Sequence, residues 1–179
     1  FDLNIMTEGQ SPADVGASVL SKLPRVFDEV KPDFLLVQGD TMTTVSAAFA
    51  AYLQRIPVGH IEAGLRTGNL DHPFPEEMNR RLTSQLTTLH FPPTQGAMDA
   101  LLKEGFDPSS IHITGNTVID ALHQALNKEY DFSEPALKRL SRDKKIILVT
   151  THRRENFGEP LMGICNALAE LVDTRDDIV

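Results

Sequence analysis

Residues 60–81, HIEAGLRTGNLDHPFPEEMNRR, concentrate ionisable side chains in a pattern that suggests chemistry more than packing. These 22 positions hold four carboxylates, two histidines and three arginines, interrupted by Gly64, Gly68, Pro73 and Pro75. The pattern matches neither the period of an amphipathic helix nor the alternation of a half-buried strand. Carboxylates and histidines are side chains that commonly transfer protons in enzymes. We therefore interpret this segment as a kinked loop that carries part of a functional site.

Two carboxylates and one histidine directly follow predicted strands. Asp40 comes after FLLVQG, Glu62 ends IPVGHIE, and His152 follows KKIILVT. A carboxylate beside a buried strand is costly unless it is paired, which favours a functional role for Glu62, with Arg66 as its expected partner. A functional role is also favoured for His152, because it ends the strongest predicted strand and precedes two arginines. Asp40 has an equally good structural interpretation as the N-cap of the next helix.

Other ionisable residues have plainer interpretations. Glu76 and Glu77 follow Pro75 in the first turn of a predicted helix, where acids complement the helix dipole. That structural interpretation is the favoured one for Glu77. Four side chains of the loop could suggest metal ligands: His60, Glu62, Asp71 and His72. Their spacing matches no strong metal signature, so no metal is expected, and His60 is interpreted as structural or solvated.

Short apolar runs alternate with helical patterns along the whole chain. Strands are predicted at FLLV, IPVGHIE, TLHF, IHIT and KKIILVT, and helices near residues 11–30, 43–54, 75–86, 94–105, 116–126 and 160–174. This alternation predicts an α/β fold with a parallel sheet and right-handed crossovers. Ligands of such sheets bind beyond the carboxyl ends of the strands, where QGD, HIEAGLR, TGN and THRREN fall. The helix starts after QGDT and TGNT would offer N–H groups suited to a phosphate.

Composition excludes several classes of function. The 179 residues carry a formal charge of -8, which argues against a nucleic-acid partner. No run of 18 apolar residues occurs, so no membrane span is expected, and FDLNIMTEG does not resemble a signal peptide. The single cysteine, Cys165, excludes an internal disulfide and fits a reducing compartment; its helical apolar neighbours predict a buried thiol. Neither a dinucleotide fingerprint nor a P-loop motif is present, and no cofactor is expected.

Five motifs, taken in order, resemble the non-hydrolysing bacterial UDP-N-acetylglucosamine 2-epimerases: QGDTMTT, IPVGHIEAGLRTGN, PFPEEMNRRLTS, ITGNTVIDAL and THRRENFG. The resemblance covers essentially the whole chain. It implies Rossmann-like parallel-sheet domains in a glycosyltransferase-B-like architecture, truncated at both ends. Residues 1–115 would form most of the N-terminal domain, and residues 116–179 the hinge and the start of the C-terminal domain. It follows that this fragment alone is expected to be inactive.

The resemblance implies interconversion of UDP-GlcNAc and UDP-ManNAc by inversion at C2. The route would be elimination of UDP, a 2-acetamidoglucal intermediate and re-addition. The chain has acids and a histidine at the family's catalytic positions: Asp40, Glu62, Glu76 and His152. Asp40 and Glu62 are the leading candidates for proton transfer at C2. Asp40, Glu62, His152 and Arg153 are expected to bind substrate, the last two near the diphosphate.

The resemblance also implies a cytoplasmic homodimer that supplies ManNAc for cell-surface polysaccharide. Arg66 and Arg80 are expected to form supporting ion pairs. Gln38 departs from the family pattern, since many members have His at this position. Three other readings of the sequence remain open: a hydrolysing epimerase that releases ManNAc and UDP, a non-catalytic UDP-sugar-binding regulatory module, and a glycosyltransferase on the same fold.

Overall fold

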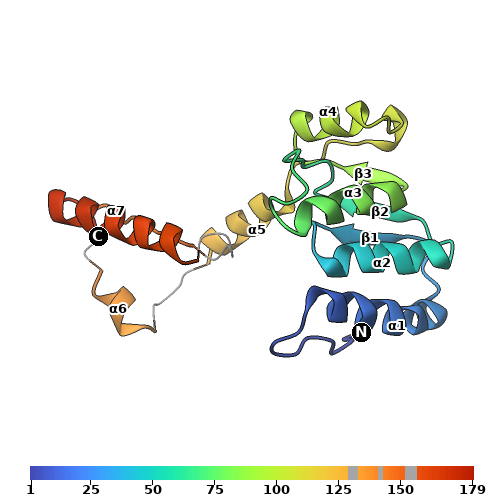
Figure 1. Ribbon diagram of the computed structural model, residues 1–179, viewed down its shortest axis with the longest axis horizontal. Coiled ribbons are helices and arrows are strands. Elements are labelled where there is room, and N and C mark those ends of the chain that lie inside the picture. Colours follow the sequence, from blue (N-terminus) through green and yellow to red (C-terminus); the bar gives the residue numbers. More distant parts are fainter. Residues whose placement is uncertain (129–132, 141–142, 152–156) are drawn as a thin grey trace. The chain divides into compact units, whose positions relative to one another are not determined.

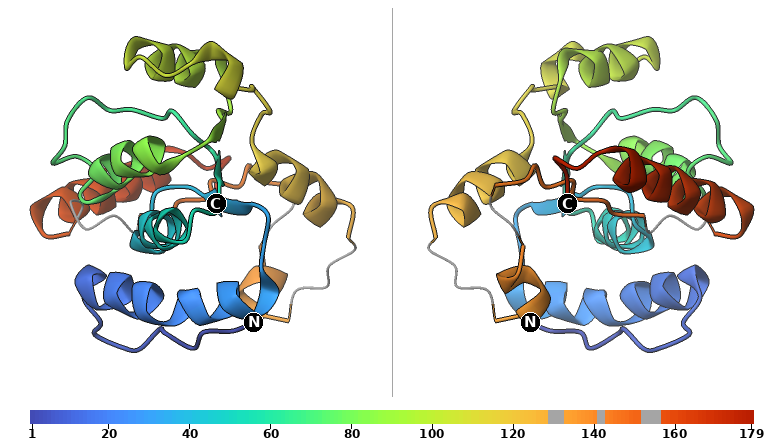
Figure 2. Two further views of the ribbon diagram at one scale, coloured as in Figure 1. Left: turned by 90° about the vertical axis from the view of Figure 1, so that its right-hand side faces the viewer. Right: turned by 90° about the vertical axis from the view of Figure 1, so that its left-hand side faces the viewer.

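The computed structural model describes residues 1–128, 133–140, 143–151 and 157–179. The chain divides into two compact units, Phe1–Ala125 and Leu126–Val179, whose helices and strands are shown in Figures 1 and 2. This division falls near the end of helix α5 (Thr117–Leu126), whereas the predicted domain boundary precedes that helix. Compact packing and domain boundaries are different properties, so the boundary after residue 115 and the hinge within residues 116–179 stay predictions.

The first unit contains a three-stranded parallel sheet, which confirms the predicted α/β class. Its strands are β1 (Leu35–Gln38), β2 (Val58–Ile61) and β3 (Leu89–Phe91), in the order β1-β2-β3. The predicted strand IHIT is reduced to a single parallel bridge between Ile111 and His90. All three strands run in the same direction, so their carboxyl ends meet at one edge of the sheet.

Helices α1 (Pro12–Val30) and α2 (Met42–Leu53) pack against each other, and α2 packs on β1 and β2. Ser11 begins α1 with a capping box: its hydroxyl accepts from the Asp14 N–H, and the Asp14 carboxylate accepts from the Ser11 N–H. The small residues of α2 allow close approach to the sheet, and Ala48 and Ala51 are fully buried. Val19 and Phe27 of α1 complete this core.

Helices α3 (Glu76–Leu86) and α4 (Gln95–Lys103) follow the loop and β3, and the short 3-10 helix η1 (Pro108–Ser110) comes next. Figure 1 shows α1, α2 and α3 lying next to one another in chain order, as their mutual contacts require. A second small core joins Ala63, Leu101 and Ile111. This core fixes the chain directly after β2 against α4, and so anchors the start of the 60–81 loop.

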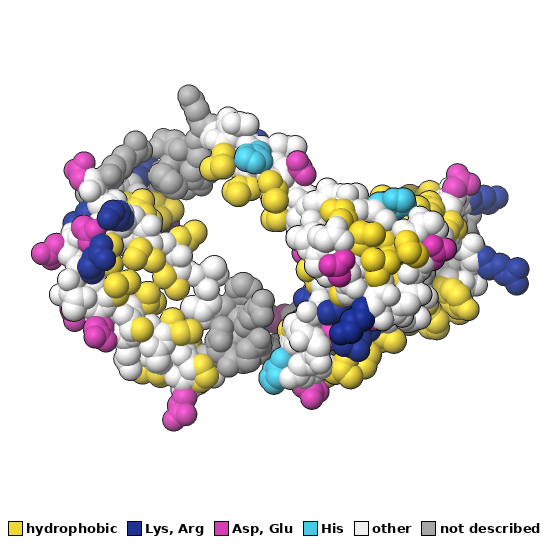
Figure 3. All heavy atoms as spheres, turned by 90° about the horizontal axis from the view of Figure 1, so that it is seen from above, with side chains coloured by type: hydrophobic (Ala, Val, Ile, Leu, Met, Phe, Trp, Pro, Cys, Tyr) yellow, Lys and Arg dark blue, Asp and Glu magenta, His cyan; other side chains and the backbone are white. Residues whose placement is uncertain are grey.

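The second unit contains α6 (Pro135–Lys138) and α7 (Glu159–Thr174). The predicted strand KKIILVT is not a strand in the described part of the second unit: Lys145 forms a parallel bridge with Ile178, and the Ile147 N–H donates to the Val179 carbonyl at 2.9 Å. Its apolar side chains at residues 146–149 are exposed, and Figure 3 shows many hydrophobic side chains at the surface of this unit. A run with strong strand propensity becomes a strand only where neighbouring chain completes the hydrogen-bond ladder.

The prediction of a buried Cys165 is wrong, because its side chain is exposed. The apolar residues of α7 that make its inner face are half-buried: Leu161, Ile164, Leu168 and Leu171. Cys165 is exposed although it directly follows the half-buried Ile164.

Candidate active site

The candidate site lies at the carboxyl ends of the parallel strands. Asp40 follows β1, Glu62 follows β2, and the segment after the Ile111 bridge reaches Asn116 at the same edge. The Gly39 N–H donates to the Ile61 carbonyl at 3.1 Å, which ties the first two strand ends together. The topology thus brings the Asp40 and Glu62 segments to one edge of the sheet, where ligands of such folds bind.

Asp40 is paired with an arginine from α3. Its Oδ2 accepts from Nε of Arg80 at 3.0 Å and from a terminal guanidinium nitrogen at 2.6 Å, which confirms the expected ion pair of Arg80. The Asp40 carbonyl also accepts from Asn79 Nδ2 at 2.9 Å. The N-cap interpretation of Asp40 is wrong, because Thr41 caps α2 by accepting from the Thr44 N–H. The Asp40 carboxylate is therefore paired with Arg80 and does not cap α2, so it stays a candidate site residue at this edge.

Glu62 occupies an unusual backbone position. Its φ of 67° lies in the left-handed region, which is rare for residues other than glycine. The Glu62 N–H donates to the Phe91 carbonyl at 3.1 Å, and its Oε1 accepts from Asn116 Nδ2 at 3.2 Å. The expected pairing with Arg66 is wrong. Arg66 instead donates from Nε and a terminal nitrogen to the two oxygens of Glu104, both at 2.8 Å.

Glu77 has a larger role than the sequence suggested. Its carboxylate is fully buried and accepts from the backbone N–H groups of Thr67 and Gly68, and from Arg80 and Arg81. Burial raises the pKa of this carboxyl, but the four donors together outweigh that effect and hold the pKa below its usual value. Glu77 therefore anchors the 60–81 loop to α3. The sequence signal that could have indicated this is the spacing of Glu77 three and four residues before Arg80 and Arg81 on a predicted helix.

The remaining predicted site residues lie elsewhere or outside the described residues. Glu76 begins α3 and is half-buried, and no described residue forms a hydrogen bond or ion pair with its carboxylate. His152 and Arg153 lie outside the described residues. Among the residues that are described, no cluster of three or more His, Cys, Asp or Glu side chains is arranged to hold a metal ion.

Two histidines lie on neighbouring strands next to the carboxyl edge of the sheet. His60 of β2 and His90 of β3 are register partners, and both are buried. His60 Nε2 lies 2.8 Å from the Gly39 carbonyl oxygen, which gives this histidine a structural role. Burial is the main cause of a lowered pKa for His60, and burial lowers the pKa of His90 to about 4. Neither imidazole is suited to carry charge in the folded protein.

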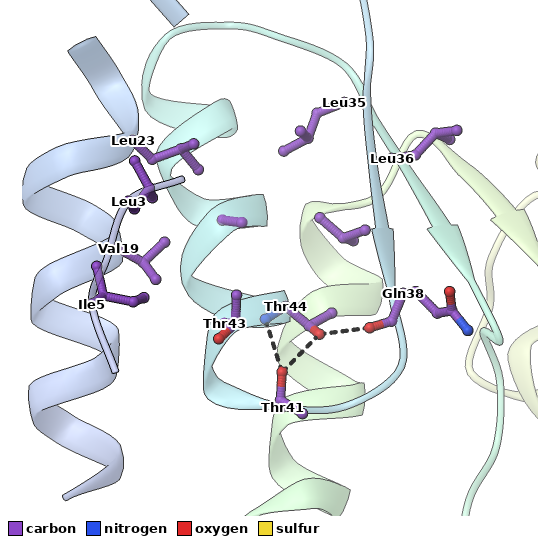
Figure 4. Close-up of a pocket in the computed structure, with 12 residues that line it drawn as sticks. Leu3, Ile5, Val19, Leu23, Leu35, Leu36, Gln38, Thr41, Thr43 and Thr44 are labelled. Atoms are coloured by element: carbon purple, nitrogen blue, oxygen red, sulfur yellow. Dashed lines mark hydrogen bonds between the residues drawn. The ribbon is translucent and has the colours of Figure 1, made fainter. Parts of the chain in front are cut away.

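A cavity of about 360 Å³ lies beside β1, between the N-terminal segment, α1 and α2. Figure 4 shows that apolar side chains such as Leu3, Ile5 and Leu23 line most of it. At its polar end Thr44 Oγ1 donates to the Gln38 carbonyl at 2.7 Å, and the Thr41 and Thr44 hydroxyls form a hydrogen bond at 3.2 Å. Its apolar lining does not suit a diphosphate.

The profile of the UDP-N-acetylglucosamine 2-epimerase family matches residues 1–179. The chain belongs to this family. The UDP-N-acetylglucosamine 2-epimerase of Bacillus subtilis is 48% identical over 99% of this chain and 46% of its own length. Thus the chain spans about half the length of that epimerase.

Solved epimerase structures share the fold. The Neisseria meningitidis UDP-GlcNAc 2-epimerase bound to UDP-GlcNAc superimposes with a TM-score of 0.89, at 44% identity over 99% of this chain and 49% of that one. The Methanocaldococcus jannaschii epimerase in complex with UDP-GlcNAc and UDP gives a TM-score of 0.81, at 34% identity over 99% of this chain and 49% of that one. These structures confirm the predicted Rossmann-like, glycosyltransferase-B-like fold class. No helix in the described parts of the chain is both long enough and apolar enough to span a membrane.

Proposed function

We propose that the protein interconverts UDP-GlcNAc and UDP-ManNAc by epimerisation at C2, as a non-hydrolysing member of its family. The observation that carries this proposal is the pair of strand-end carboxylates, Asp40 and Glu62, within a chain of the UDP-N-acetylglucosamine 2-epimerase family. The ligands named for the Neisseria and Methanocaldococcus relatives support UDP-GlcNAc as the substrate.

The reaction needs more than simple deprotonation at C2. That carbon bears an acetamido group and has no adjacent carbonyl, so its proton is only weakly acidic. In an anti elimination, a carboxylate accepts the C2 proton as the bond from C1 to UDP breaks, which forms the C1–C2 double bond of 2-acetamidoglucal. UDP then re-adds to C1 while a carboxyl group delivers a proton to the opposite face of C2. Two carboxyl groups on opposite sides of the sugar suit this sequence.

Asp40 and Glu62 are assigned the two proton transfers. Arg80 holds Asp40 at short range, so the position of that carboxylate is set before substrate binds. We propose that Glu76 orients the loop or binds the ligand. His152 and Arg153 are assigned to the diphosphate, where positive charge would stabilise the leaving group.

Proton NMR in deuterated water tests the reaction. The complete polypeptide that carries residues 1–179 is incubated with UDP-GlcNAc. Loss of the C2 proton signal together with formation of UDP-ManNAc is the expected result. Accumulation of free ManNAc and UDP would instead identify a hydrolysing epimerase, and binding without any spectral change would identify a regulatory module. We expect residues 1–179 alone to be inactive, since they span about half of a typical relative.

The Glu62→Gln variant tests the residue assignment. The amide keeps the shape of the side chain but cannot accept the C2 proton, so turnover should fall by on the order of 100-fold or more. The matched control is Glu8→Gln, which makes the same change at an exposed position of the first unit. A well-folded Glu62→Gln protein with normal turnover would remove Glu62 from the mechanism.

We also propose a cytoplasmic homodimer that supplies ManNAc units for cell-surface polysaccharide. Large apolar side chains exposed on the adjacent helices α2 and α3 favour self-association: Phe49, Tyr52, Leu53, Met78 and Leu82. Sedimentation of the wild type and of a Tyr52→Glu variant tests the homodimer. A dimeric wild type and a weakened dimer in the variant are expected, and a monomeric wild type would refute the homodimer.

A further inference from the structure

Asn116 uses both ends of its side-chain amide. Its Nδ2 donates to Glu62 Oε1 at 3.2 Å, and its Oδ1 accepts from the Val118 N–H at 3.0 Å in the first turn of α5. Turning the amide over would place an oxygen against the carboxylate and an NH2 group against an N–H donor. The two partners therefore determine the orientation of the amide. Asn116 joins the start of α5 to a carboxylate 54 residues away along the chain.

The backbone of Glu62 is held equally firmly. Its N–H and that of Ala63 both donate to the Phe91 carbonyl, at 3.1 and 3.3 Å, which maintains the left-handed conformation at Glu62. Glu62 Oε2 faces Gly39, 3.8 Å from the position that a Cβ would occupy there. Among the described residues, no donor forms a hydrogen bond with Oε2. One oxygen is thus held by Asn116 and the other is open.

A second hydrogen bond holds the start of α5 at the same edge. Gln38 Nε2, at the end of β1, donates to Thr117 Oγ1 at 3.3 Å. The start of α5 is therefore tied to the ends of both β1 and β2 through adjacent residues. These contacts limit the freedom of Asn116 to move away from the Glu62 carboxylate.

We propose that Asn116 is a positioning residue that holds Oε1 of Glu62 and thereby presents Oε2 to the C2 proton of the substrate. The inference rests on the proposed epimerisation and adds a residue to its machinery. A proton-transferring carboxylate must meet its proton within narrow limits of distance and angle, so loss of the Asn116 donor lowers the rate of chemistry more than the affinity for substrate.

Two variants separate positioning from helix capping. Asp and Ser are N-cap residues comparable to Asn, so Asn116→Asp and Asn116→Ser both keep an acceptor for the Val118 N–H. Both remove the Nδ2 amide that donates to Glu62, and the serine hydroxyl is one bond shorter than that amide. Asn116→Asp also sets a negative charge against the Glu62 carboxylate, whereas Asn116→Ser adds no charge. Asn127→Asp makes the same chemical change at an exposed turn and serves as the matched control.

The kinetic test uses the complete polypeptide and UDP-GlcNAc. We expect kcat to fall on the order of 10-fold in Asn116→Ser and 100-fold in Asn116→Asp, with KM changed less than about 3-fold and the melting temperature nearly constant. Unchanged kcat in both variants, beside an active wild type, would overturn the inference. So would a loss of kcat that merely follows a fall in melting temperature, since that indicates capping alone.

A second measurement does not depend on activity. NMR of the Asn116 side-chain amide in isotopically labelled protein should show its proton signals shift strongly on Glu62→Gln and much less on Glu76→Gln. Equal, negligible shifts would mean that the contact with Glu62 is not formed, and would overturn the inference. A wild type with this contact but without C2 exchange would refute the proposed epimerisation, so the two failures are distinguishable.

Discussion

Acidification should destabilise the first unit through His90, and His90→Phe should remove most of that effect. His90 is buried in β3, and its ring centroid lies 4.8 Å from that of Phe106. Burial, followed by Coulombic interaction with His60 and Arg66, lowers the pKa of His90 from 6.5 to about 4. A native pKa below the unfolded one means that the unfolded chain takes up the proton first. The stabilisation is complete above about pH 6.5 and is lost as the pH falls toward about 4.

The magnitude follows from the linkage relation. The full difference between the two pKa values corresponds to about 3 kcal/mol, of which about 2 kcal/mol is lost between about pH 7 and pH 5. Urea unfolding of residues 1–179, followed by circular dichroism, measures the free energy of unfolding at both pH values. His90→Phe should stay within about 1.5 kcal/mol of the wild type at neutral pH, because the aromatic replacement fills a similar volume beside Phe106.

The comparison between variants isolates His90 from the other titrating groups. The wild type should lose about 2 kcal/mol more than His90→Phe on the same acidification. His123→Phe, which removes a histidine from the exposed surface of α5, should behave as the wild type does. If the wild type and His90→Phe lose equal stability, burial does not depress the pKa of His90 and the reasoning is refuted.

Three further substitutions test, by urea unfolding, the anchor of the 60–81 loop, the close packing of Gly64 on α4 and the cap of α1. Glu77→Gln should destabilise the protein by about 2–3 kcal/mol, because the buried carboxylate loses its charge-assisted bonds, whereas Glu76→Gln beside it should change stability by less than about 0.5 kcal/mol. Gly64→Ala should cost on the order of 3 kcal/mol, since Gly64 has φ of 80° and a Cβ would collide with the Ala97 carbonyl. Ser11→Ala should cost about 1 kcal/mol through loss of the capping box of α1.

Each of these three has a result that would contradict it. Equal effects of Glu77→Gln and Glu76→Gln would mean that the buried hydrogen bonds do not anchor the loop. A stable Gly64→Ala protein would mean that the chain after β2 can move away from α4. An unchanged Ser11→Ala protein would mean that solvent satisfies the first N–H groups of α1 equally well.

Local patterns in the sequence were sufficient for much of the fold. The helical pattern near residues 11–30 predicted α1, the alternation of apolar runs and helices predicted a parallel sheet, and the strand ends placed Asp40 and Glu62 together at one edge. These predictions succeed because side-chain periodicity is a local property, and because strands joined by helical crossovers run parallel. The run KKIILVT shows the limit of such patterns, since in the described part of the chain it forms a bridge at Lys145 and not the predicted strand.

The sequence by itself determined the family, the α/β class and the carboxylates at the strand ends. The tertiary structure alone decided which groups hold them. Arg66 pairs with Glu104, 38 residues away, instead of its near neighbour Glu62, and Glu62 is held by Asn116 from another element. Side-chain partners are selected by proximity after the sheet and helices pack, and a charged group pairs with whatever packing brings within reach. For that reason sequence spacing could place the reactive carboxylates but could not assign their partners.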